Sequence, residues 1–166
     1  MTPAFRLAAA SFVALIAALP FVPAQPAPLM RGIALVLLCL AAVFVGLPVL
    51  QLRRHGAAPD GGRFWETTAV AQRGLYAIVR HPQYLGCDFL AWGLATFALY
   101  WGTILPAMVL TFAVSRHTRA EEDRLRSRFG DVYRAYMRTV PRFGLITGLV
   151  RYLRRAAASS RARESA

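Results

Sequence analysis

Two short clusters hold most of the residues suited to chemistry. The first lies between Gly74 and Gly86, where Arg80, His81 and two tyrosines crowd against the start of a long apolar segment. Ionisable groups at the edge of a membrane segment are costly to place there, so they indicate a site. The alternative interpretation is an interfacial belt, because arginine and tyrosine also anchor membrane helices near the lipid headgroups.

Glycines and a proline shape the backbone of this first cluster. Gly74 and Gly86 allow backbone angles or close approaches that other residues do not. Pro82 disfavours the helical conformation at His81 and is itself suited to the first turn of a helix. We therefore expect a helix that begins at or just after Pro82 and directs its first N–H groups towards a ligand near His81 and Tyr84.

The second cluster is the acidic pair Glu121 and Glu122, at the end of the next apolar segment. One predicted helical hairpin separates the two clusters, so both should emerge on the same face of the membrane. His81, His117 and the acidic pair are the candidates for taking up a proton during a transfer reaction. The alternative is that the pair only belongs to a solvated charge network on an arginine-rich helix.

The composition indicates a small integral membrane protein. The chain has 166 residues, of which 57% are hydrophobic, and this is too apolar for a soluble domain of its size. All 20 basic residues are arginine, and the formal net charge is +12. Because the arginines lie beside apolar segments, we expect anionic lipid headgroups as their partner rather than nucleic acid.

We expect four membrane-spanning helices; about 20 apolar residues are enough to cross a bilayer, and the fourth apolar segment alone is shorter than this. The first is either a retained span or a cleaved signal peptide. The turn Trp101–Thr103 is so short that it predicts an antiparallel hairpin between the last two spans, and the last helix is expected to continue to Phe129. The segments run roughly over residues 4–23, 32–52, 84–100 and 104–116.

The arginine distribution predicts the orientation. With four spans, nineteen of the 20 arginines fall on one face and Arg31 alone falls on the other. Because arginine-rich loops stay in the cytoplasm, both termini and both clusters are expected on the cytoplasmic side of a bacterial-type inner membrane. A three-span alternative, with the first segment cleaved, also leaves both clusters inside.

The expected organisation is a single membrane domain, all-α, in four consecutive parts. These are a two-span hairpin over 1–55, a loop with the first cluster over 56–84, a hairpin with an amphipathic helix over 85–142, and an interfacial segment with a flexible tail over 143–166. The tail is expected to begin at Ala156.

The amphipathic helix is predicted from a run of apolar residues at helical spacing. It should begin after Gly130 and end near Pro141, with its apolar face on the membrane surface. The residues that set this spacing are Val132, Tyr133, Tyr136 and Val140.

Both clusters resemble a known superfamily. The first reads Gly-x-Tyr-x-x-x-Arg-His-Pro-x-Tyr-x-Gly over Gly74–Gly86. The second begins at Glu121-Glu122 and continues through Phe129-Gly130 to Val140-Pro141-Arg142. Separated by one hydrophobic hairpin, they resemble the isoprenylcysteine carboxyl methyltransferase and phospholipid methyltransferase superfamily. The resemblance covers about half of the chain and is specific for the superfamily rather than for a substrate.

This resemblance implies S-adenosylmethionine as methyl donor, bound at the cytoplasmic ends of the last helices. The implied acceptor is a lipid or small hydrophobic molecule that enters from the bilayer. A substrate-contacting arginine of eukaryotic members falls near His117 here, which argues against an isoprenylated protein substrate. His81 and Glu121 are the implied catalytic residues. Carried over by position, the implied cofactor contacts are Tyr76, Arg80, His81, Pro82, Gln83, Tyr84, Glu121 and Glu122.

Several alternatives stay open. The acceptor atom is a carboxylate oxygen, a phospholipid amine nitrogen or a thiol sulfur. An NADPH-dependent membrane reductase of the sterol or steroid type and a non-enzymatic membrane subunit are the other functions considered. Asp88 either lines a pocket or pairs with an arginine, and the oligomeric state is undetermined.

The remaining metal-binding residue types predict no metal site. The three histidines are scattered, and none shows the spacing of paired metal ligands. Cys39 and Cys87 both fall in apolar segments, where we expect buried, reduced thiols that pack as small hydrophobic groups.

Overall fold

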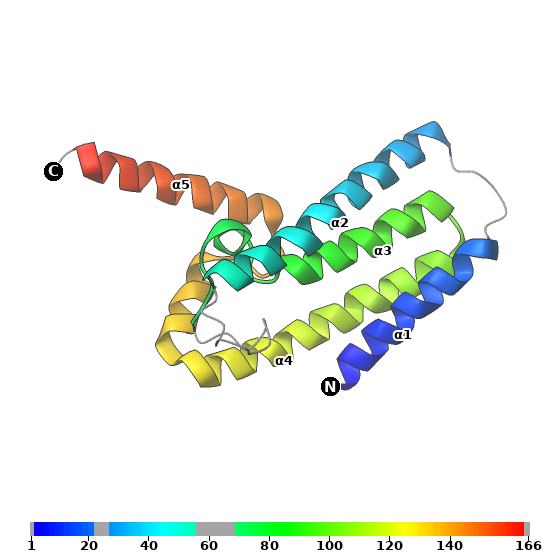
Figure 1. Cartoon of the computed structure of the whole chain (residues 1–166), viewed down its shortest axis with the longest axis horizontal. Coiled ribbons are helices and arrows are strands. Elements are labelled where there is room, and N and C mark those ends of the chain that lie inside the picture. The colour runs from blue at the N-terminus through cyan, green and yellow to red at the C-terminus, as the bar shows by residue number, and fades with distance from the viewer. Residues whose placement is uncertain (1, 22–26, 56–68, 165–166) are drawn as a thin grey trace. The chain divides into compact units, whose positions relative to one another are not determined.

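The computed structural model describes residues 2–21, 27–55 and 69–164. Within these residues the chain is helical and contains no strand, which confirms the all-α prediction (Figure 1). The elements are α1 (Pro3–Ala18), η1 (Leu19–Phe21), α2 (Pro28–His55), η2 (Gly74–Ala77), α3 (Pro82–Ala98), α4 (Trp101–Thr139) and α5 (Leu145–Glu164), where η marks a 3₁₀ helix.

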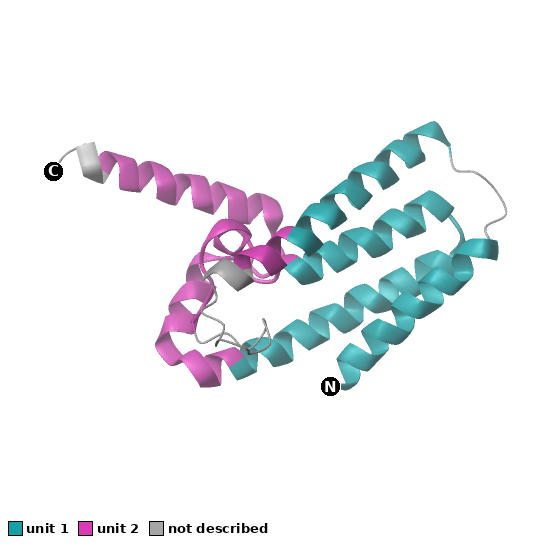
Figure 2. Ribbon diagram, in the orientation of Figure 1, with its two compact units in different colours: residues 1–46, 83–124 teal, residues 47–82, 125–166 magenta. Residues whose placement is uncertain are grey.

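The chain forms two compact units, each built from two separate stretches (Figure 2). Unit 1 comprises residues 1–46 and 83–124, and unit 2 comprises residues 47–82 and 125–166. The division between Pro82 and Gln83 falls inside the first sequence cluster, at the start of α3.

Two helical stretches in the described part of the chain are long and apolar enough to cross a membrane. They are Pro3–Phe21 and Pro28–Gln51, and they coincide with the first two predicted spans. The second helix begins four residues before the predicted span, because Pro28 is well suited to a first helical turn. Arg31 is therefore part of that first turn. The third and fourth predicted spans form α3 and the beginning of α4.

One face of α2 is left uncovered by protein. Leu35, Val36 and Val43 are 57%, 60% and 44% exposed, and Cys39 on the same face is also exposed. The prediction of a buried thiol is therefore wrong for Cys39, because no other element among the described residues covers this face of α2. Cys87 is partly buried, and both cysteines are free thiols.

In unit 1, α3 packs against α2 through glycines. A Cβ atom at Gly86 would lie 2.7 Å from the carbonyl carbon of Phe44 and 2.8 Å from the amide nitrogen of Val45. Gly93, seven residues further along the same face, would bring a Cβ within 3.0 Å of Leu38. The missing side chains of the two glycines allow the two helix backbones to approach closely.

The link between α3 and α4 differs from the predicted turn. The predicted turn Trp101–Thr103 is wrong, because these residues form the first turn of α4 and the connection is Leu99–Tyr100. Thr103 stabilises this start, since both its N–H and its hydroxyl donate to the carbonyl of Tyr100, at 2.9 and 2.7 Å. Leu99 makes the turn with a φ of 45°, a left-handed conformation that side chains other than glycine rarely adopt.

In unit 2, α4 is interrupted at Gly130, whose φ of 54° and ψ of −127° are not helical. The helix that follows ends at Thr139, so the predicted start and end of this amphipathic segment are confirmed. Three of the four residues that set its apolar spacing, however, form protein core instead of an uncovered surface, whereas Val132 is 59% exposed. Tyr133, Tyr136 and Val140 are buried, and the partly buried residues packed against them are Val70, Leu125, Phe129 and Met137.

The last helix, α5, is continuous from Leu145 to Glu164. It therefore extends through most of the segment after Ala156, where we expected a flexible tail. The exposed apolar residues of α5 include Ile146 and Leu153, which are 80% and 56% exposed.

Candidate functional site

The eight site residues that the sequence predicted divide equally between the two units. Tyr76, Arg80, His81 and Pro82 belong to unit 2, and Gln83, Tyr84, Glu121 and Glu122 belong to unit 1. The predicted helix start is confirmed, because Pro82 is the first residue of α3. The first N–H groups of α3 have no partner within their own helix, which is the usual condition of a helix N-terminus.

A chain of hydrogen bonds in unit 1 connects both sequence clusters. The hydroxyl of Tyr84 is hydrogen-bonded to the carboxylate of Glu121. The same hydroxyl lies 3.0 Å from Nε2 of His117, and Nδ1 of His117 lies 2.7 Å from the hydroxyl of Thr2. His117 and Glu121 are four residues apart on α4, so they share one helical face.

The directions of these bonds follow from what each group can donate. An ionised carboxylate only accepts, so Tyr84 donates to Glu121 and its oxygen accepts from Nε2–H of His117. Nδ1 then carries the lone pair and accepts from the hydroxyl of Thr2. That hydroxyl in turn accepts the N–H of Phe5 at 3.2 Å, as an N-cap does. The neutral Nε2–H tautomer of His117 satisfies every bond in this series.

The two adjacent glutamates have different surroundings. Glu122 is fully buried, with 0% of its surface exposed, whereas Glu121 is partly exposed. Because neighbouring residues of a helix point about 100° apart, the two carboxylates face different directions. Glu121 is the one that is hydrogen-bonded to Tyr84, so the surroundings of the two carboxylates differ.

A second polar group lies inside the hairpin of α3 and α4. The hydroxyl of Thr111 donates to Oδ1 of Asp88 at 3.1 Å and accepts from Nε1–H of Trp92 at 3.0 Å. Of the two interpretations of Asp88, the arginine pair is not found among the described residues, where its carboxylate instead accepts a hydrogen bond from Thr111, and the pocket-lining interpretation stays a prediction. Asp88 lies four residues after Tyr84, one helical turn further along the same face of α3.

In unit 2, the segment that carries the first cluster is fixed mainly through its backbone. Tyr136 donates its hydroxyl to the carbonyl of Tyr76 at 2.6 Å. Arg155 donates from Nη2 to the carbonyl of Ala77 at 2.8 Å, and Leu75 donates its N–H to Oε1 of Gln51 at 3.0 Å. Three separate elements thus hold consecutive peptide groups of one short segment.

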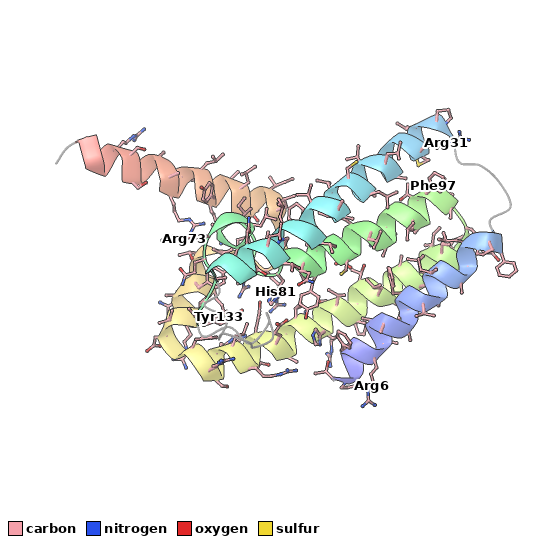
Figure 3. The ribbon with its side chains drawn as sticks, viewed as in Figure 1. Arg6, Arg31, Arg73, His81, Phe97 and Tyr133 are labelled. Atoms are coloured by element: carbon pink, nitrogen blue, oxygen red, sulfur yellow. The ribbon has the colours of Figure 1, made fainter. Side chains whose placement is uncertain are left out.

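The backbone amides of Arg80 and His81 are hydrogen-bonded to the segment that follows α4. The N–H of Arg80 donates to the carbonyl of Pro141 at 2.9 Å, and the N–H of His81 donates to the carbonyl of Arg142 at 3.4 Å. His81 is 6% exposed, and its ring centre lies 6.1 Å from that of Phe143. Figure 3 labels His81 together with Tyr133, which belongs to the core of the same unit.

Electrostatics keep the Tyr136 hydroxyl in its donor form. Burial raises the pKa of Tyr136 well above its ordinary value, because a charged phenolate is poorly solvated there. The hydroxyl therefore stays protonated and continues to donate to the carbonyl of Tyr76 throughout the neutral pH range.

Comparison with known proteins decides the family. The family described as phospholipid methyltransferase matches residues 29–132. The chain belongs to the phospholipid methyltransferase family. The match includes the first cluster, Glu121 and Glu122, the His117 network from Tyr84 onwards, and Gln51. It ends before α5.

A curated relative points in the same direction. The protein-S-isoprenylcysteine O-methyltransferase of Schizosaccharomyces pombe is 42% identical over 71 residues, which cover 41% of this chain. The chain spans only 29% of the length of that relative. No solved structure matches the chain.

Sequence reasoning missed three residues that hold the candidate site in place: Thr2, Gln51 and Arg155. Thr2 precedes Pro3 and is recognisable as a helix N-cap, but its second bond to His117 is not. Gln51 is the first strongly polar residue after an apolar run. This position predicted the end of a span but not the hydrogen bond to Leu75. Arg155 is one of many arginines and had no distinguishing signal.

Proposed function

We propose that this protein is an integral membrane methyltransferase that uses S-adenosylmethionine and methylates a lipid or another small hydrophobic acceptor. Membership of the phospholipid methyltransferase family supports the reaction class. The hydrogen bond between Tyr84 and Glu121 carries the proposal furthest, because it connects the two sequence clusters that the superfamily resemblance depends on.

The residues present fit the chemical groups of the donor. The donor carries an ammonium group and ribose hydroxyls, which suit the carboxylates of Glu121 and Glu122, and a carboxylate, which suits Arg80 and His81. Atoms Nε and Nη1 of Arg80 are buried from solvent, where such a bond is strong. The donor contacts that we propose are Tyr76, Arg80, His81, Pro82, Gln83, Tyr84, Glu121 and Glu122.

Aromatic residues complete this set. The aromatic rings of Tyr76 and Tyr84 are suited to pack on adenine or to stabilise a sulfonium cation. The N–H groups in the first turn of α3, which begins at Pro82, add a partial positive charge suited to the donor's carboxylate.

The bound donor supplies an electrophilic methyl group, and the protein's task is then to position an acceptor and to manage its proton. A carboxylate or thiolate acceptor needs no base. For an amine acceptor, Glu121 is the base that we favour, because its carboxylate is hydrogen-bonded to the Tyr84 hydroxyl. His117 holds Tyr84 in turn. His81 is the other catalytic candidate.

The membrane arrangement belongs to the same proposal. Besides the two long apolar helices, α3 and the first part of α4 complete a four-span topology with both termini in the cytoplasm. The donor enters from the cytoplasm, and the acceptor arrives laterally from the bilayer of the inner membrane.

The deciding experiment is binding of S-adenosylhomocysteine, the product form of the donor, to detergent-purified protein by calorimetry. We expect micromolar-range binding, about −8 kcal/mol, that is lost in His81→Ala and in Glu121→Ala. Asp131→Asn is the control, because this carboxylate is exposed and pairs with its helical neighbour Arg134. Folded wild-type protein that binds no S-adenosylhomocysteine would refute the proposal.

A further inference from the structure

Helix α5 has two faces with different surroundings, and one of them holds the first sequence cluster. Arg155 donates to the carbonyl of Ala77 at 2.8 Å. Gly148, seven residues earlier and so on the same helical face, lies so close to the carbonyl of Ile78 that a Cβ there would overlap with it. This inner face therefore holds two consecutive peptide groups just before Arg80 and His81.

The opposite face of α5 is apolar and uncovered. Ile146, Leu149, Val150 and Leu153 are 80%, 44%, 42% and 56% exposed. Their spacing of three, four and seven residues from Ile146 places them in one stripe along the helix. An uncovered apolar stripe on a charged helix is the usual design of a helix that lies in a membrane interface.

The charge of α5 is complementary to an anionic membrane surface. The helix contains five arginines, and Glu164 at its end is its sole acidic residue. The described arginines Arg151, Arg154 and Arg161 are exposed. Arginines near an anionic leaflet are attracted to its headgroups.

Unit 2 also contains the end of a candidate membrane span. The apolar stretch Pro28–Gln51 ends at Gln51, whose side chain accepts the N–H of Leu75. The same segment that α5 holds from one side is therefore bonded to the terminus of a membrane helix within the same unit. Because this segment is bonded to the end of a membrane helix, a bilayer surface is the apolar partner that we expect near α5.

We propose that α5 docks its stripe of Ile146, Leu149, Val150 and Leu153 into the interface of an anionic bilayer leaflet. Because its inner face holds the carbonyls of Ala77 and Ile78, docking fixes the segment that leads into Arg80 and His81. Binding of the methyl donor then depends on the lipid charge. This last step rests on the proposed function, whereas the docking itself does not.

The docking is tested on the full chain in nanodiscs. Leu149→Cys, in a background where Cys39 and Cys87 are replaced by alanine, is labelled with an environment-sensitive fluorophore. The discs contain phosphatidylcholine with or without an equal part of phosphatidylglycerol, and brominated lipid serves as the quencher. We expect strong quenching at position 149 in the anionic discs and little at Ser159→Cys, which is exposed on the inner face.

The coupling is tested by S-adenosylhomocysteine binding in the same two discs. We expect the affinity to be about three- to tenfold higher in the anionic discs. Leu149→Gln combined with Leu153→Gln should abolish this difference. Arg155→Gln should weaken binding in both discs, whereas Ser159→Ala, an exposed and uncharged position one turn further along the same face, should change the affinity about twofold at most.

The two readouts separate the proposals. Absence of quenching at position 149 overturns the docking of α5, whatever the cofactor does. Quenching without any S-adenosylhomocysteine binding leaves the docking in place and refutes the methyltransferase proposal. Quenching with binding that is insensitive to lipid charge overturns the coupling.

Discussion

The two units hold their candidate site residues by different means. In unit 1 the bonds run between side chains, from Glu121 through Tyr84 and His117 to Thr2. In unit 2 the backbone from Leu75 to His81 is bonded instead, whatever side chains it carries. A substitution in unit 1 should therefore change the chemistry of the site, whereas a substitution around the segment of unit 2 should change its position.

The largest effects should come from the close glycine contacts, one in each unit. In Gly86→Ala the new Cβ meets the backbone of Phe44 and Val45, which cannot move aside as a flexible side chain can. We expect a loss of about 1–3 kcal/mol and a fall in Tm of roughly 2–12 °C. Gly46→Ala is the control, because no atom lies within 4 Å of a Cβ built there. Equal thermal stability of the two variants would contradict the close packing of α2 and α3.

The corresponding change in unit 2 is Gly148→Ala, which places a Cβ against the carbonyl of Ile78. Because Ile78 lies within the first cluster, two residues before Arg80, we expect S-adenosylhomocysteine affinity to fall by about 5- to 150-fold, from an overpacking cost of about 1–3 kcal/mol. Gly86→Ala should lower Tm more than affinity, and Gly148→Ala should do the opposite. If the loss of Tm and the loss of affinity stood in the same ratio in both variants, the distinction between the units would be wrong.

Glu121→Gln should give the next largest effect. It keeps the shape of the side chain and its contact with Tyr84 but removes the charge. Hydrogen bonds to charged groups contribute about 1.5–3 kcal/mol, so we expect calorimetric affinity for S-adenosylhomocysteine to fall by about 10- to 100-fold. Tm should change little. An unchanged affinity would show that the carboxylate charge does not contact the donor.

His117→Ala should have a moderate effect, because His117 acts through Tyr84. Loss of one hydrogen bond of about 1 kcal/mol predicts an affinity about fivefold lower. His117→Gln can place an amide N–H near the position of Nε2 and should recover part of this loss. Arg119→Ala, an exposed neighbour on α4, is the control. If glutamine recovers nothing, the bond from Nε2–H to Tyr84 is not what His117 contributes.

Tyr136→Phe should have the smallest effect on affinity and a clear effect on the pH dependence of stability. The variant loses the bond to the carbonyl of Tyr76, about 1 kcal/mol. Because burial raises the pKa of Tyr136, the folded state favours the neutral hydroxyl. Its contribution is complete below the ordinary tyrosine pKa of about 10 and declines as the pH rises above it.

The comparison is made by thermal unfolding across that alkaline range. The wild type should lose stability above pH ~10 more steeply than Tyr136→Phe does. Parallel curves for the two proteins would show that the Tyr136 hydroxyl is not held in its neutral form.

Local sequence signals predicted the helices and their interruptions well. Pro82 starts α3 because proline suits a first helical turn, and Gly130 interrupts α4 because glycine tolerates a positive φ. Leu99 shows the limit of such signals. It takes a left-handed conformation without being glycine, so the predicted turn fell on Trp101–Thr103, two residues too late.

The contacts that hold the candidate site were harder to predict, because they join residues far apart in the chain. Thr2 and His117 are 115 residues apart, and Ala77 and Arg155 are 78 apart. The types of two side chains do not predict that they form a hydrogen bond when they lie so far apart in the sequence. The apolar face of Tyr133, Tyr136 and Val140 was identified correctly. Whether protein or lipid covers this face depends on distant parts of the chain, so the local sequence could not predict it.

Gly130 also has a consequence for how α4 opens. A helix is cooperative only where its ladder of amide hydrogen bonds is continuous, and the dihedral angles of Gly130 interrupt that ladder. The amides on its two sides should therefore exchange with solvent deuterium as separate groups. The stretch from Asp131 to Thr139, which holds the carbonyl of Tyr76 through Tyr136, can then open and close without fraying the part of α4 that bears Glu121.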